Sequence, residues 1–117
     1  PLPWEAARGA AEAPLRYAEL EAETAWAKQL RALATARDAA RLALDGARTQ
    51  LGLAEARMAL ELESLRLAKR QVEEGQMDAL DFVTVLRRAR EAVLAAELSK
   101  LELERAVSRV NQAEGVV

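Results

Sequence analysis

Four carboxylates lie close together in the sequence and are the side chains best placed to do chemistry. They occur within nine residues, at Glu73, Glu74, Asp78 and Asp81. Paired carboxylates can coordinate a metal ion or act as a general acid and base. Around a glycine, however, such a cluster is much more often a solvated helix cap and loop, which is the interpretation we favour. The sequence therefore predicts no catalytic, cofactor-binding or metal site.

The rest of the composition excludes most other site chemistry. The chain contains no cysteine and no histidine, so disulfide scaffolds, Cys/His zinc sites and nucleophiles with a histidine base are excluded. The formal net charge of -2 gives no basic footprint for nucleic acid. No apolar run approaches the roughly 20 residues that span a bilayer. We expect a protein that is not an enzyme and binds neither a cofactor nor nucleic acid.

The composition is typical of long helices. Alanine, leucine, glutamate and arginine predominate, and all three prolines lie within the first 14 residues. We expect a helix over about 15–74, a tight turn at 75–78 and a second helix over about 79–113. The predicted fold is all-α, a long antiparallel coiled-coil hairpin. It forms a single domain over 15–117 that follows an entry segment over 1–14.

The predicted turn carries stop and start signals in the right order. Gly75 suits the left-handed residue just past a helix C-terminus. Asp78 can cap the next helix through the amides of Leu80 or Asp81. Met77 and Phe82 occupy the two positions of a hydrophobic staple. An alternative turn at Asp45-Gly46 would instead give a self-contained bundle of three helices.

A heptad pattern predicts how the two helices pack. Both have apolar positions at alternating spacings of four and three residues, which implies a left-handed supercoil. In the second helix the expected seam is Phe82, Leu86, Ala89, Val93, Ala96, Lys100, Leu103, Val107 and Val110. In the first it is Leu44, Ala47, Leu51, Ala54, Met58, Glu61, Leu65, Ala68 and Val72. A reversal at Gly75 pairs seam positions whose numbers sum to 154.

Each helix also has a second apolar edge that the hairpin leaves over. The first carries a stripe of small residues at Ala18, Ala22, Ala25, Gln29, Ala32, Ala36, Ala39 and Ala43. The second has large residues at Leu80, Val83, Leu94, Leu98 and Leu101. Each helix therefore has two apolar faces, and a hairpin buries only one of them. We expect partners outside the chain to cover the others.

Basic residues flank the acidic cluster on both sides of the predicted turn and form a basic band. It comprises Arg66, Lys69, Arg70, Arg87, Arg88 and Arg90. We expect these cations to pair within their own helices, with Glu63, Glu73 and Glu91, on solvated faces.

Three segments, in order, resemble the TolC-like outer-membrane efflux protein family. Residues 67–83, LAKRQVEEGQMDALDFV, are similar to that family's L-A-x-x-x-Y-x-x-G-x-x-x-x-L-D-V-L segment. The helix ending in Ala113-Glu114-Gly115 resembles its closing helix and terminal A-x-G. Upstream, Leu2-Pro3-Trp4 followed by Arg8-Gly9-Ala10-Ala11 is similar to its P-L-[FW]-x-x-G-x-x-x-A element. The resemblance covers essentially the whole chain.

The resemblance implies a role in a trimeric export channel. The chain would be the C-terminal helical repeat of the periplasmic tunnel of one protomer, in a homotrimer whose barrel is embedded in the outer membrane. Residues 1–14 would be the junction between barrel and helix. The turn would lie at the periplasmic tip, where it gates the tunnel and meets a periplasmic adaptor protein and an inner-membrane pump.

The resemblance also implies roles for single residues at the tip. Asp81 matches an aspartate that rings the family's periplasmic entrance, although its usual companion three residues on is Thr84 here. The tip and gate positions are Val72, Glu73, Glu74, Gly75, Met77, Asp78, Asp81 and Phe82. Because Val72 replaces an aromatic family residue and Met77 replaces a basic one, closure would rest on packing of Val72, Met77 and Phe82.

An interaction module of another class is the alternative function. The coiled-coil hairpin of a periplasmic adaptor, or a structural stalk, would bind a partner through its tip. Adaptor hairpins are usually inserted in a lipoyl-type β-domain. Nothing in this sequence predicts a strand, which favours the channel.

Overall fold

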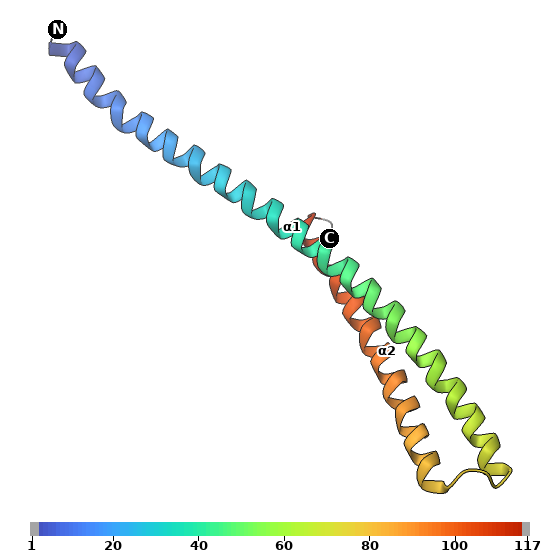
Figure 1. Ribbon diagram of the computed structural model, residues 1–117. Coiled ribbons are helices and arrows are strands. Elements are labelled where there is room, and N and C mark those ends of the chain that lie inside the picture. The colour runs from blue at the N-terminus through green and yellow to red at the C-terminus, as the bar shows by residue number, and fades with distance from the viewer. Residues whose placement is uncertain (1–2, 116–117) are drawn as a thin grey trace. The chain divides into compact units, whose positions relative to one another are not determined.

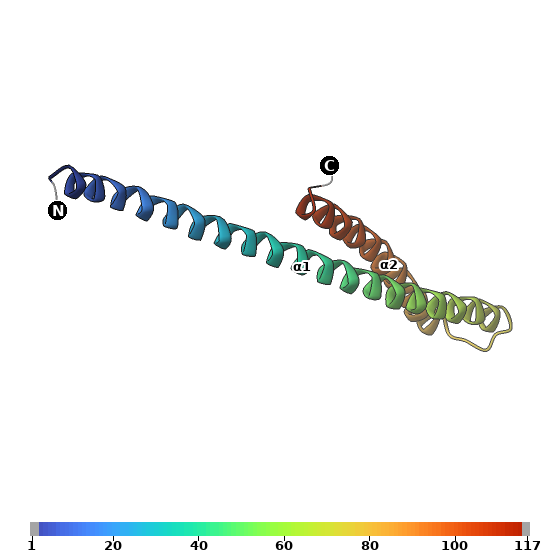
Figure 2. The ribbon, with the colours of Figure 1, turned by 90° about the horizontal axis from the view of Figure 1, so that it is seen from above.

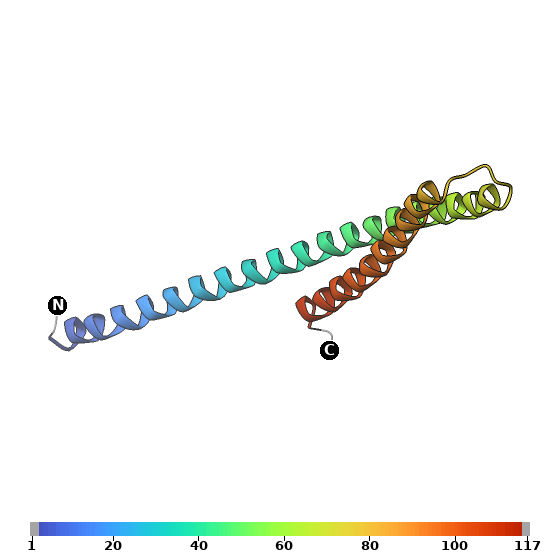
Figure 3. The ribbon, with the colours of Figure 1, turned by 90° about the horizontal axis from the view of Figure 1, so that it is seen from below.

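The computed structural model describes residues 3–115, with side chains at residue 4 and at residues 12–115. It contains two helices, α1 (Pro3–Glu73) and α2 (Ala79–Ala113), and no strand within the described residues. Figure 1 shows α2 running back along α1 after the turn, and Figure 2 and Figure 3 show it crossing α1. The predicted all-α helical hairpin is confirmed.

The first helix begins earlier than predicted. The expected start was near residue 15, but α1 already includes Pro3 and runs through Pro14. Proline at position 14 removes one backbone donor. The alanine- and glutamate-rich residues on both sides have high helix propensity, which favours helix across this single interruption. The segment over 1–14 is therefore helical from Pro3 onward.

The helix is also continuous through Asp45 and Gly46, so the three-helix alternative is wrong. A single glycine costs a helix about 1 kcal/mol relative to alanine. The heptad pattern from Leu44 to Ala47 continues unbroken across it, and both of these side chains are half-buried. Packing against α2 thus outweighs the cost of the glycine.

The chain divides into two compact units, Pro1–Asp38 and Ala39–Val117. In the first unit every side chain described between residues 12 and 38 is exposed, except for half-buried Ala27. Tyr17 and Trp26 are 66% and 63% exposed. The alanine stripe of this unit therefore has no neighbour within the unit.

The second unit contains the hairpin, and its helices pair in the predicted register. Arg41 on α1 donates two hydrogen bonds to Glu114 Oε1, from Nε at 2.9 Å and Nη2 at 2.6 Å. Their residue numbers sum to 155, one more than the predicted value of 154. Nearer the turn, Leu65 of α1 and Ala89 of α2 line the same groove, as their predicted pairing requires.

The seam of α1 is as predicted over most of its length. From Leu44 to Ala68, each predicted seam residue is buried or half-buried, and the residues between them are exposed. Val72, the last predicted position, is 39% exposed. This final layer, next to the turn, is therefore only partly covered.

In the seam of α2, one of the two predicted heptad columns is confirmed and the other is wrong. The column Ala89, Ala96, Leu103 and Val110 lies in the seam as expected, but its partner column is Val85, Ala92, Ser99, Ala106 and Ala113. Lys100 and Val107, which were expected in the seam, are exposed, and Lys100 instead pairs with Glu97 at 3.3 Å. Leu86 and Val93 are half-buried beside the seam. Small side chains in the seam let the two helices approach closely. Because α2 is rotated about its own axis relative to the predicted seam, the Lys100 ammonium lies in water.

The hairpin core consists of alanine alone. The buried residues among those described are Ala68, Ala89, Ala92, Ala96 and Ala106. No large side chain is fully buried in the part of the chain that the structure describes. The hairpin therefore leaves most of its leucines outside, where they are free to contact something else.

Candidate functional site

The turn is closed by backbone hydrogen bonds at the end of α1. Gly75 has φ +72°, which alanine or larger residues rarely adopt. Its N–H donates to the Val72 carbonyl at 3.0 Å, and the Gln76 N–H donates to the Gln71 carbonyl at 2.8 Å. These two bonds form a Schellman motif, which confirms the predicted helix stop.

The restart of the chain as α2 also follows the prediction. Asp78 is the N-cap residue, and its Oδ1 accepts a hydrogen bond from the Leu80 N–H at 3.3 Å. Asp81 lies in the first turn of α2, where its charge meets the positive end of the helix. Met77 and Phe82 are half-buried, at the two positions of the expected staple.

The carboxylates at the tip are exposed to solvent. Glu73, Glu74, Asp78 and Asp81 are all exposed, and no ion pair of theirs occurs within the described residues. No group of three or more His, Cys, Asp or Glu among the residues described is arranged to hold a metal ion. The geometry is that of a solvated cap, and the roles of these residues in gating remain predictions.

The basic band pairs less than predicted. Only Arg66 finds its expected partner, donating from Nη2 and Nε to the two oxygens of Glu63 at 2.6 and 3.0 Å. The hydrogen bond from Arg66 lowers the pKa of Glu63, and the same bond raises the pKa of Arg66. The other five cations, Lys69, Arg70, Arg87, Arg88 and Arg90, form no ion pair within residues 12–115. Ion pairs between exposed side chains contribute little to stability, so these five cations gain little from pairing.

Two glycine substitutions should shift stability in opposite directions. We expect Gly75→Ala to lower the free energy of unfolding by about 1 kcal/mol, because alanine disfavours the left-handed conformation. Gly52→Ala should raise it by about 0.5–1 kcal/mol, because Gly52 lies inside α1. Beyond the adjacent backbone of the chain, no atom lies within 4 Å of an added Cβ at either position. Urea unfolding followed by circular dichroism measures both, and a stabilising Gly75→Ala would contradict the turn geometry.

An outward stripe of leucines runs along each helix of the second unit. On α2 four of the five residues of the predicted second edge form the stripe: Leu80, Leu94, Leu98 and Leu101 are between 51% and 76% exposed. The fifth, Val83, is 46% exposed but lies in a heptad column beside the stripe. On α1 the stripe consists of Leu42, Leu53, Leu60 and Leu67, between 44% and 74% exposed. Sequence reasoning missed this second stripe. It could have been found, because Gly46, Leu53, Leu60 and Leu67 continue the heptad column of Ala18, Ala25, Ala32 and Ala39.

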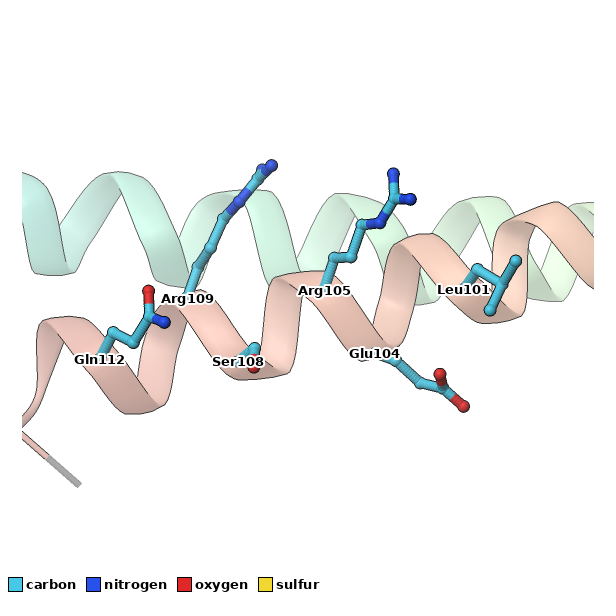
Figure 4. A pocket seen from close by; sticks show the side chains of 6 residues that line it. All are labelled: Leu101, Glu104, Arg105, Ser108, Arg109 and Gln112. Carbon is cyan, nitrogen blue, oxygen red and sulfur yellow. The ribbon is translucent and has the colours of Figure 1, made fainter. Parts of the chain in front are cut away.

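On the outward face of α2, basic and acidic side chains extend to opposite sides of the helix. Along its C-terminal half a shallow groove is lined by Leu101, Glu104, Arg105, Ser108, Arg109 and Gln112. Figure 4 shows Arg105 and Arg109 extending to one side of the helix and Glu104 to the other. The leucine stripe is thus bordered by different side chains on its two sides.

Comparison with known proteins gives no family for the chain. No protein-family model, curated protein or solved structure matches it. Within residues 3–115, neither helix has a stretch long and apolar enough to cross a lipid bilayer.

Proposed function

We propose that the chain is a wall segment of a TolC-like outer-membrane efflux channel. It contributes one helical hairpin to the periplasmic tunnel of a homotrimer and acts as a non-catalytic conduit for exported compounds. The proposal is supported by the resemblance of the three sequence segments, by the hairpin fold and by the capped turn at Gly75 and Asp78.

The register of the two outward leucine stripes is the observation that carries the proposal. If hairpins of this register stand side by side at equal height, with a copy of this chain standing in for the other repeat of the protomer, α1 of one hairpin meets α2 of the next at positions whose numbers again sum to 154. In the middle of the hairpin the stripes then match: Leu60 meets Leu94, Leu53 meets Leu101, and Ala56 meets Leu98. Nearer the turn, Leu67 meets Arg87. Equal height is what rotational symmetry about an axis parallel to the hairpin requires.

The angle between the two contact faces of each helix also fits a wall. The seam and the outward stripe are separated by three steps of the seven-position heptad wheel, or about 150°. Faces at that angle place neighbours on nearly opposite sides of each helix. Such helices build a gently curved sheet of helices, whereas a compact bundle needs faces closer to a right angle.

The tip is proposed as the gate and docking end of the tunnel. Asp81 would ring the periplasmic entrance, and packing of Val72, Met77 and Phe82 would close it. All four lie at the turn, with Met77 and Phe82 half-buried there. A periplasmic adaptor protein and an inner-membrane pump would meet the channel at this end.

The alternative, an adaptor hairpin or stalk, leaves the outward leucine stripes without a role. Such a module would bind its partner through the tip and would not need the outward leucine stripes.

Electrical recording tests the proposed function. The full-length protein that carries this chain is purified and reconstituted into planar lipid bilayers. We expect discrete ion-conducting channels, since the proposed tunnel is filled with water. Folded protein that inserts into the bilayer and conducts no ions would contradict the proposal and would favour the interaction module.

A further inference from the structure

The hairpin has two unequal surfaces, and the difference says which one faces the inside of a curved wall. Each heptad has seven columns, of which two form the seam and two the outward stripe. The remaining three are divided unequally, one column on one side of the helix and two on the other. Measured around the helix axis, the angle between the seam and the outward stripe is smaller on the side with one column. In a closed tube of helices, the side with the smaller angle faces the inside and is concave.

The single columns of both helices lie on one surface of the hairpin. On α1 the column is Ala43, Gln50, Arg57, Ser64 and Gln71; on α2 it is Asp81, Arg88, Ala95, Glu102 and Arg109. One groove of the hairpin is lined by Ala43 and Gln50 from α1 together with Glu102 and Arg109 from α2. A different groove, lined by Leu62, Arg90 and Val93 beside seam and stripe residues, marks the two-column surface.

The two surfaces differ in chemistry as well as in width. The single-column surface carries only small, polar or charged side chains, as a water-filled passage requires. The two-column surface includes Leu62, Val83 and Val107, which are 43%, 46% and 39% exposed.

We infer that the single-column surface lines the lumen and that its basic residues make the passage favour anions; this rests on the proposed channel function. At register 154, Arg88 is level with position 66 of α1, so Arg57 lies nine residues, or about 14 Å, farther along the axis. They lie between the acidic levels of Asp81 and Glu102, and Arg109 adds a third basic level. Neither Arg57 nor Arg88 forms an ion pair within the described residues, so both charges act on the solution. Each copy contributes three arginines and two carboxylates to this surface, a net charge of +1.

Charge reversal on the two surfaces of α2 tests the inference. Arg88 and Arg90 are both exposed and two residues apart, but they lie on opposite surfaces. In planar bilayers under a KCl gradient, we expect Arg88→Glu to lower the chloride-to-potassium permeability ratio at least about twofold. Arg57→Glu should act in the same direction, Arg88→Lys should preserve the ratio, and Arg90→Glu should leave it unchanged. Circular dichroism and thermal unfolding confirm that each variant is folded.

The outcomes separate this inference from the function on which it rests. An absence of conductance from the unmodified protein contradicts the channel itself. A conducting channel in which Arg90→Glu changes the ratio and Arg88→Glu does not would show that the lumen lies on the other surface. Equal effects of the two variants, or none from Arg57→Glu and Arg88→Glu, would also overturn the inference.

Discussion

Replacing Ala92 with leucine is expected to lower the free energy of unfolding of the hairpin by about 2–3 kcal/mol. Ala92 is fully buried in α2, in a seam whose buried residues are all alanine. The larger side chain adds three carbon atoms where two helices are in close contact. Because no large core residue is available to shrink in compensation, the helices must move apart along this part of the seam.

A matched substitution separates overpacking from the change in residue type. Ala59→Leu makes the same change at an exposed position of α1, and we expect it to alter stability by less than about 0.5 kcal/mol. Urea unfolding of both variants, followed by circular dichroism, gives the difference. If Ala92→Leu were neutral, the seam would run through the column of Lys100 and Val107, as the heptad pattern alone suggests.

The turn could be predicted from sequence because its determinants are local. Gly75 and Asp78 each act on backbone groups within five residues, through a left-handed conformation and a capped amide. The start of α1 could not be predicted in the same way. Pro14 reads as a barrier, but one missing hydrogen bond does not end a helix whose other residues favour it.

The partner column of the α2 seam was misassigned because hydrophobicity favours one set of residues in the seam and close helix packing favours another. Leu86, Val93 and Val107 are more apolar than Ala92, Ser99 and Ala106, so a heptad count places the larger residues inside. In the structure the small residues are inside, since close approach of two helices depends on side-chain size. The outward stripe of α1 was overlooked for a related reason, because its column changes from alanine to leucine after Gly46.

An interchain disulfide between cysteines at positions 60 and 94 is the second large expected effect. Leu60 and Leu94 are 72% and 63% exposed in the hairpin, and no residue of the second unit covers them. Side-by-side copies in register bring them directly opposite each other, within the Cα separation of roughly 4.4–6.8 Å that a disulfide needs. The chain has no cysteine of its own, so each engineered thiol is unique.

Two control pairs test the face and the register of this contact. Leu62→Cys, combined with Leu94→Cys, moves the first thiol off the outward stripe, although Leu62 is also exposed. Leu67→Cys, combined with Leu94→Cys, keeps the thiol on the stripe but displaces it by one heptad, about 10 Å. We expect both pairs to give much less product than the matched pair.

The decisive measurement uses two populations of the chain, one carrying Leu60→Cys and the other Leu94→Cys, mixed and oxidised under mild conditions. The wall arrangement predicts that the mixed dimer, identified by its mass after digestion, predominates over both homodimers and both control pairs. Folded chains that yield only Leu94→Cys homodimers, or no mixed product at all, would contradict the side-by-side packing of hairpins through their outward leucine stripes.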